Sequence, residues 1–165
     1  MSYVCSQCGV AHENLPVWAC RAPDLWAGAS EQERQQDFNL NGDFCMFRDE
    51  HYFIRCVLQI PIIDSDTEIF EFGVWSTLSA ENFRRYYDTF DDTDQSKLGP
   101  MFGWFANRLS GYPDTLSLAC DVLPQDNRKR PLVRFHEADH PLVLQQQEGV
   151  TLREAIDYLH ARDAL

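Results

Sequence analysis

Two cysteines near the start of the chain have the spacing of a metal-binding turn. Cys5 and Cys8 are separated by two residues, and Gly9 follows directly. In such a turn both thiolates point inward, and a glycine with positive φ directs backbone N–H groups at the sulfur atoms. The pattern predicts zinc bound by Cys5 and Cys8. Redox motifs share this spacing, but they begin a helix that follows a strand, whereas glycine and an irregular stretch follow here.

A structural zinc site needs four ligands in a tetrahedron, so two more must come from elsewhere. His12 lies three residues beyond Gly9 and is the candidate for the third position. Cys45, on an expected strand, is the candidate for the fourth, with Cys20 and His51 in reserve. Four protein ligands would make the zinc structural, whereas three ligands and a water would make it catalytic. Without metal, the first two cysteines would be idle reduced thiols.

Length and composition predict a folded protein with a strongly acidic surface. The chain has 165 residues, of which 44% are hydrophobic, so one domain over residues 1–165 can bury a core, with residues 1–20 as a knuckle segment packed on it. The 14 basic and 26 acidic residues give a net charge of -12. This charge argues against nucleic acid as a partner and favours encounter with a basic protein.

Neither export nor membrane insertion is indicated. The first ten residues lack a basic stretch followed by an apolar one, and no apolar run approaches the ~20 residues that a membrane span needs. We therefore expect a cytoplasmic protein with no membrane partner. In that compartment its six cysteines would be reduced, metal-bound or buried rather than paired in disulfides.

Runs of aromatic and β-branched residues indicate a sheet. The run from His51 to Ile63 is the longest, and charged turns separate it from the runs before and after it. Consecutive strands with short connections imply an antiparallel meander. We expect strands at residues 44–47, 51–63, 70–75, 101–109, 115–123 and 132–136.

Capping residues predict helices outside these strands. Ser30 and Thr151 each precede a glutamate by three residues, which forms a capping box, and Ser79 begins a helix that runs to about residue 90. Pro141 suits a further helical start. Because the strands are grouped and the helices lie outside them, the fold class is α+β: a mostly antiparallel sheet with a few flanking helices and an N-terminal zinc-knuckle-like segment.

Aromatic residues near the expected sheet are candidates for a binding groove. Tryptophan and tyrosine are favoured at binding hot spots, although the same side chains are also typical of a sheet core. Strand alternation puts the rings of Phe102 and Trp104 on one face and leaves Gly103 opposite, where it allows close packing. The candidate groove residues are Trp75, Trp104, Tyr112, Asp114 and His140.

His140 has two alternative roles. It follows Asp139, and a histidine beside a carboxylate can act as a general base. It also directly precedes Pro141, so it can simply cap the helix that begins there, and we favour this structural role. The chain has no serine-nucleophile elbow, phosphate-binding glycine loop or His-Glu-x-x-His motif, and we assign no catalytic residue.

Six segments that span nearly the whole chain form a recognisable set. They are Cys5-x-x-Cys8-Gly9-x-x-His12-x-x-Leu15-Pro16, Phe53-x-Arg55-x-x-Leu58-x-Ile60-Pro61-Ile62, Phe72-Gly73-Val74-Trp75-Ser76-x-Leu78-Ser79, Phe102-Gly103-Trp104, Tyr112-Pro113-Asp114-Thr115-Leu116 and Asp139-His140-Pro141-Leu142. In this set the chain resembles the bacterial domain of unknown function family 2199. The resemblance implies a bacterial, cytosolic setting and supports the knuckle, and it implies that a cysteine is frequent at position 45. It brings no established activity.

Three functions fit these observations. We favour a non-enzymatic protein-binding module with a structural zinc site, whose acidic or aromatic surface engages a basic protein; neutralising a basic toxin, as immunity proteins do, is one version. The first alternative is a zinc-dependent hydrolase in which Cys5, Cys8 and His12 leave one metal position open. The second is a structural accessory module whose zinc only fixes the terminus.

Overall fold

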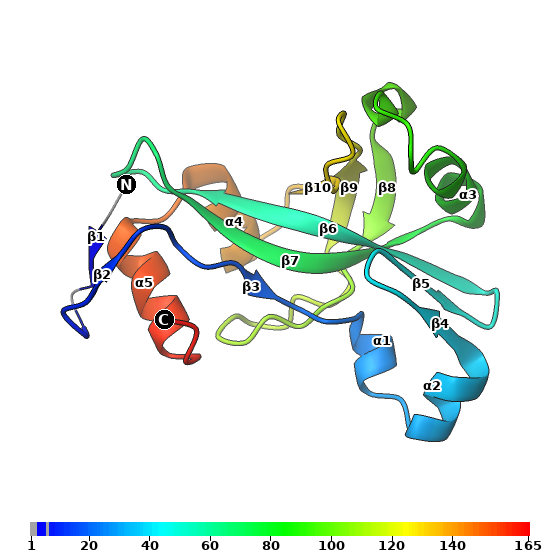
Figure 1. Cartoon of the computed structure of the whole chain (residues 1–165), viewed down its shortest axis with the longest axis horizontal. Coiled ribbons are helices and arrows are strands. Elements are labelled where there is room, and N and C mark those ends of the chain that lie inside the picture. The colour runs from blue at the N-terminus through cyan, green and yellow to red at the C-terminus, as the bar shows by residue number, and fades with distance from the viewer. Residues whose placement is uncertain (1–2, 6) are drawn as a thin grey trace.

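Two long strands, β6 (His51–Pro61) and β7 (Ile69–Leu78), form the axis of the molecule in the computed structural model, which describes residues 3–5 and 7–165 (Figure 1). They pair antiparallel along almost their whole length, from Tyr52 opposite Leu78 to Pro61 opposite Ile69. This is the antiparallel pairing that two consecutive strands with a short connection predicted. Alternate residues of β6 are buried on one face, so the pair forms the floor of the main core.

Six further strands extend this pair into an eight-stranded sheet. They are β3 (Trp18–Ala19), β4 (Phe38–Leu40), β5 (Phe44–Phe47), β8 (Met101–Trp104), β9 (Ala119–Leu123) and β10 (Leu132–Phe135). The main strand order is β3-β7-β6-β10-β9-β8, while β5 pairs with both β4 and β6. Only the β3–β7 and β10–β6 pairs are parallel, so the predicted mostly antiparallel sheet is confirmed.

The sheet curls so that its last strand returns to β7. Ser76 of β7 forms an isolated bridge with Phe105, which directly follows β8, and the Ala106 N–H donates to the Trp75 carbonyl at 2.9 Å. Gly103 permits this close approach, because a Cβ at this position would collide with the Thr77 carbonyl oxygen. The predicted packing role of Gly103 is therefore confirmed.

In the residues that the structure describes, five α-helices and one 3-10 turn lie outside the sheet. They are α1 (Asp24–Ala27), α2 (Glu31–Asp37), α3 (Ala80–Asp88), η1 (Gln95–Leu98), α4 (Pro141–Glu148) and α5 (Leu152–His160). The predicted caps are confirmed: Ser30 and Thr151 form capping boxes, and the Ser79 hydroxyl accepts from the Asn82 N–H. The fold class is thus α+β. None of the helices in the described part of the chain is both long and apolar enough to cross a membrane.

Two expected strands are shorter than the sequence suggested. The strand expected at 101–109 ends at Trp104, and the one expected at 115–123 begins at Ala119. Backbone hydrogen bonds still join Phe105 to residues 117 and 118. Beyond them a side chain takes over: the Thr115 hydroxyl donates to the Asn107 carbonyl at 2.6 Å and accepts from the Leu109 N–H at 3.0 Å. Residues 105–118 therefore form a loop that is held by hydrogen bonds among its own residues.

The two faces of the β6–β7 pair contribute to two separate hydrophobic clusters. The larger cluster fills the curled sheet and includes Ile54, Leu58 and Phe72, with α4 and α5 packed against it through Leu142 and Leu159. The smaller one, which we call the outer cluster, consists of Cys45, Phe53, Trp75 and Ala106. Both clusters consist of side chains at most 7% exposed, so apolar burial stabilises this part of the molecule.

Candidate metal centre

A short N-terminal hairpin carries the predicted metal-binding turn. β1 (Tyr3–Val4) pairs antiparallel with β2 (Ala11–His12), and both cysteines lie in the connection between them. The Cys5 N–H donates to the Val10 carbonyl at 2.9 Å, and the Gly9 N–H donates to the Cys5 carbonyl at 2.9 Å. Gly9 has a φ of 70°, the left-handed conformation that the sequence predicted for it.

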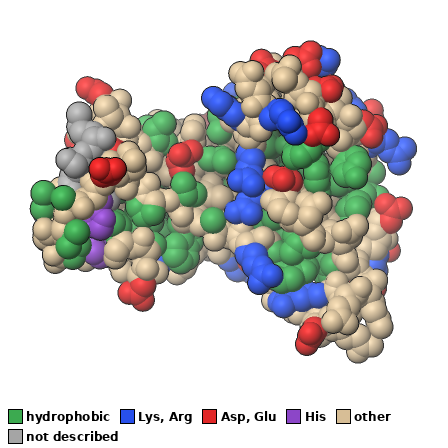
Figure 2. Space-filling model, in the orientation of Figure 1, with side chains coloured by type: hydrophobic (Ala, Val, Ile, Leu, Met, Phe, Trp, Pro, Cys, Tyr) green, Lys and Arg blue, Asp and Glu red, His purple; other side chains and the backbone are tan. Residues whose placement is uncertain are grey.

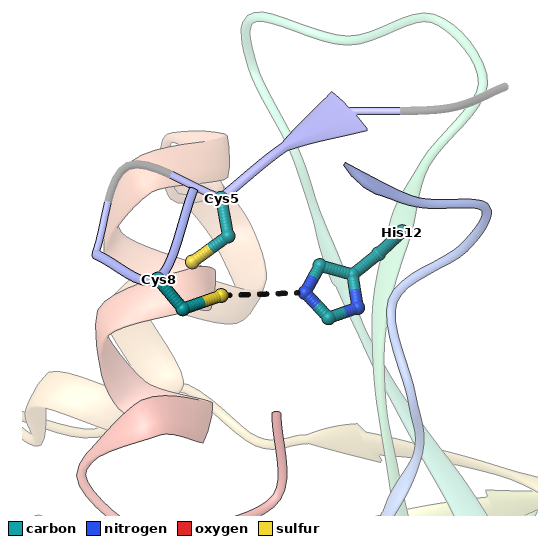
Figure 3. A group of neighbouring side chains, drawn as sticks. All are labelled: Cys5, Cys8 and His12. Atoms are coloured by element: carbon teal, nitrogen blue, oxygen red, sulfur yellow. Dashed lines mark hydrogen bonds between the residues drawn. The ribbon is translucent and has the colours of Figure 1, made fainter. Parts of the chain in front are cut away.

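The hairpin brings three of the predicted ligands together. The Sγ atoms of Cys5 and Cys8 and a ring nitrogen of His12 all lie within 4.8 Å of one another. The sulfur atoms of Cys5 and Cys8 lie beside each other, and the His12 ring faces the Cys8 sulfur (Figure 3). Cys8 Sγ lies 3.7 Å from Nε2 of His12. This group has the donors and the spacing to hold a metal ion.

The Cys5 thiol is prepared for ionisation. Cys5 is only 1% exposed, and burial alone would raise the pKa of its thiol. Hydrogen bonds from the backbone N–H groups of Cys8 and Gln7, together with the side chains of His160 and Cys8, outweigh burial and lower the Cys5 pKa to about 7. Because the thiolate is the form that binds metal, this environment favours a ligand role near neutral pH.

The last helix, α5, forms one wall of the site. His160, its final residue, places Nε2 2.6 Å from Cys5 Sγ, and Asp157 accepts a hydrogen bond from the Gln7 side chain at 2.5 Å. Ile156 and Leu159 anchor the same helix in the body of the protein. Sequence reasoning missed His160, because 155 residues separate it from Cys5 and no spacing rule connects them.

Cys45, the expected fourth ligand, does not join this group. It lies on β5, at the opposite end of the long strands from the hairpin, and is fully buried in the outer cluster (Figure 1). Burial raises its pKa to about 12, so Cys45 stays a neutral thiol. It therefore packs as a small apolar side chain and does not act as a metal ligand. Of the two reserves, His51 stacks on Phe47 near β5, and burial raises the pKa of Cys20 to about 11. The structure corrects the assignment of Cys45.

The comparisons with known proteins agree with the resemblance in the sequence. Residues 4–150 match a family model, DUF2199, described as an uncharacterized protein conserved in bacteria. The chain belongs to this family. Neither the curated proteins nor the solved structures gave a match. The matched residues include the three-ligand group but stop before α5, so His160 lies outside the match.

The five expected groove residues do not form one groove. Trp75 is fully buried in the outer cluster, and its indole N–H donates to the Cys20 carbonyl at 3.1 Å. Trp104, in contrast, is 49% exposed on β8. The difference follows from strand alternation together with the curl of the sheet, which covers one of the two tryptophans and not the other.

Tyr112, Asp114 and His140 form a separate structural unit. The Nδ1 of His140 accepts from the Leu142 N–H at 3.1 Å and caps α4, which places the proton on Nε2. That Nε2–H then donates toward the carbonyls of Pro113 and Asp114 at 3.1 and 3.2 Å. With both ring nitrogens engaged by the backbone, His140 has the favoured capping role. The Tyr112 hydroxyl similarly donates to the side chain of Gln145 in α4, at 2.7 Å.

Proposed function

We propose that this protein is a non-enzymatic protein-binding module whose N-terminal hairpin is fixed by a structural zinc ion. The binding proposal depends on one observation, the exposed aromatic pair Phe102 and Trp104 on β8. These residues are 44% and 49% exposed, and their rings meet edge to face with centroids 5.0 Å apart. Aromatic side chains of this size supply most of the binding energy at protein interfaces.

Two surface grooves border Trp104 and give a partner side chain places to insert. One, of about 410 Å³, is lined by Leu25, Phe53 and Arg108 among others. The other, of about 390 Å³, is lined by His51, Leu78 and Asn82 among others. An aromatic anchor between two partly apolar grooves is the arrangement typical of an interface hot spot.

A basic protein is the partner class that the charge of the chain favours. The net charge is -12, and Figure 2 shows acidic side chains at both ends of one face of the molecule, with a band of Lys and Arg side chains between them. A charge of this size accelerates encounter with an oppositely charged surface, while the aromatic pair supplies the contact energy. Neutralisation of a basic toxin, as immunity proteins do, is one form of this function.

The geometry of the hairpin supports zinc in a structural role. In a zinc tetrahedron, with Zn–S and Zn–N bonds near 2.3 and 2.0 Å, sulfur and nitrogen lie about 3.5 Å apart. The 3.7 Å between Cys8 Sγ and His12 Nε2 fits this edge. Val4 and Val10, beside the turn, are 69% and 54% exposed, so little apolar burial holds the hairpin. The hydrolase alternative needs an open metal position facing a pocket, but both Trp104 grooves are lined by other residues.

Capture experiments with matched variants test the binding proposal. Tagged wild type, a Phe102→Ala/Trp104→Ala double variant and a Tyr87→Ala control are used as baits in lysate from a bacterium that encodes the protein. Tyr87 is an exposed aromatic residue on α3, at 54% exposure. We expect wild type and Tyr87→Ala to retain the same basic protein, and the double variant to bind it at least about tenfold more weakly. High salt should weaken the capture.

Two results would contradict the proposal. A partner retained equally by the double variant would place the interface elsewhere. Failure of the wild type to retain any partner, in a lysate where the protein is naturally produced, would favour the structural accessory module instead.

A further inference from the structure

Each cysteine of the turn faces the Nε2 atom of a different histidine. Cys8 Sγ lies 3.7 Å from Nε2 of His12, and Cys5 Sγ lies 2.6 Å from Nε2 of His160. The first histidine belongs to the hairpin, and the second comes from the last turn of α5. Two sulfurs and two imidazole nitrogens make up the Cys2His2 donor set of a closed structural zinc site.

We infer that His160 is the fourth ligand, so that the metal ion joins the N-terminal hairpin to the end of α5. This inference rests on the metal site in the proposed function and not on the partner surface. The 2.6 Å between Cys5 Sγ and His160 Nε2 is shorter than the sulfur–nitrogen distance of about 3.5 Å in a zinc tetrahedron. His160 also lies outside the group of three whose donor atoms are all within 4.8 Å of one another. Binding the ion therefore requires the His160 ring to move about 1 Å away from Cys5 Sγ and toward the shared centre of Cys8 and His12.

The surroundings favour a direct ligand over a hydrogen-bond donor to the thiolate. The Cys5 sulfur already accepts from the backbone N–H groups of Gln7 and Cys8, which is the usual outer support of a metal-bound thiolate. Asp157, one turn earlier in α5, is engaged by the Gln7 side chain. His160 is thus the α5 side chain whose donor atom lies against a ligand sulfur.

Cobalt titration of the full chain tests the inference. Co²⁺ takes the place of Zn²⁺ in such sites, its visible bands report the coordination number, and its near-ultraviolet charge-transfer bands grow with each bound thiolate. The proteins compared are wild type, His160→Ala, His160→Cys and a His51→Ala control. His51 lies on β6 beside Phe47, at the other end of the molecule. Zinc affinity is then measured by competition with a chromogenic chelator.

The expected pattern is specific. Wild type and His51→Ala give tetrahedral spectra with the intensity of two thiolates. His160→Ala binds zinc at least about 100-fold more weakly, because loss of a direct ligand exceeds the 10–100-fold typical of outer-shell residues. In the same variant the cobalt spectrum changes, because the position of the missing imidazole is either filled by water or left open. His160→Cys retains tetrahedral cobalt and gains the intensity of a third thiolate.

Other results overturn the inference. An unchanged cobalt spectrum in His160→Ala, or no added thiolate intensity in His160→Cys, would show that His160 lies outside the coordination sphere. Wild type that binds neither cobalt nor zinc would remove the metal site itself, and with it this inference, but would leave the partner surface to be judged by the capture experiment. Because His160 is half-buried at a helix end, its removal opens no core cavity, and the variants should fold.

Discussion

Cys5 and Cys45 are both almost fully buried, at 1% and 0% exposure, yet their environments act in opposite directions. In the hairpin, backbone and side-chain hydrogen bonds outweigh burial and lower the pKa of Cys5 to about 7. In the outer cluster, burial acts without such donors and raises the pKa of Cys45 to about 12. Burial alone therefore does not decide what a cysteine does. The hydrogen-bond donors around the sulfur distinguish a candidate metal ligand from a cysteine that only packs in an apolar cluster.

The same contrast applies to how each region is held together. The hairpin consists of two strands of two residues each, and its valines point into solvent. Such a segment cannot be stabilised by apolar burial, so it depends on its contacts with α5 and on the proposed metal ion. The outer cluster has no need of a metal, because Trp75 and Phe53 exclude water from the strands around them.

Cysteine substitutions should show the largest difference between the two regions. We expect one zinc ion per chain in wild type and in Cys45→Ser, and none in Cys5→Ser/Cys8→Ser. Apparent binding free energies of structural zinc are roughly 10–16 kcal/mol, so removal of both thiolates should abolish binding. Elemental analysis of protein purified without chelators or a competing metal resin measures this. Loss of zinc from Cys45→Ser, or its absence from wild type, would contradict the comparison.

The two tryptophans provide the next largest effect. Trp75→Ala removes a fully buried ring from the outer cluster and should destabilise the protein by about 3–5 kcal/mol. Trp104→Ala removes a half-exposed ring and should change stability by less than about 1 kcal/mol, although it should weaken partner binding. Urea denaturation gives both values. Equal destabilisation by the two substitutions would mean that Trp104 is a packing residue and not part of a binding surface.

Local rules predicted the elements that local interactions determine. The capping residues Ser30, Ser79 and Thr151 begin helices because each side chain bonds a backbone N–H only three residues away. The dense apolar run produced β6, and its pairing with the next run followed from a short connection. The turn at Gly9 is equally local. In all of these cases the interacting groups are neighbours in the sequence.

Contacts between distant segments could not be predicted from residue type and spacing. Cys45 matched the chemistry of a zinc ligand, but the path of β5 places it in the outer cluster. His160 reaches Cys5 only because α5 folds back beside the hairpin. The early end of β8 at Trp104 depends on the hydrogen bonds of Thr115 and Asn107 in the loop that follows. Residue type predicted what each group can do, and the tertiary fold determined which groups meet.

A substitution at Gly103 tests how far the stability of the protein depends on close backbone packing between β7 and β8. In Gly103→Ala the new Cβ would meet the Thr77 carbonyl and the Ser76 hydroxyl, so β8 must move away from β7. We expect a loss of about 1–3 kcal/mol, measured by urea denaturation. Gly42→Ala is the matched control, because a Cβ there has no neighbouring atom within 4 Å. If both substitutions have the same small effect, the contact between β7 and β8 is not tight.

The last predicted effect is on the pH dependence of stability in the metal-free protein, which has opposite signs for the two cysteines. The folded-state pKa of Cys5, about 7, is below the ordinary value of 9.0, so its contribution to stability is present above pH 9 and is lost as pH falls through 7. The folded-state pKa of Cys45, about 12, is above 9.0, so its contribution is present below pH 9 and is lost as pH rises toward 12.

Unfolding free energies measured from pH 6.5 to 10 in wild type, Cys5→Ser and Cys45→Ser separate these contributions. Compared with wild type, Cys5→Ser should lose the rise in stability between pH 7 and 9, and Cys45→Ser should lose part of the decline above pH 9. A shared pH profile for Cys5→Ser and wild type would mean that the thiolate gains nothing from the hairpin. The metal would then have to supply all of the preference for ionised Cys5, rather than bind to a thiol that the fold has already prepared.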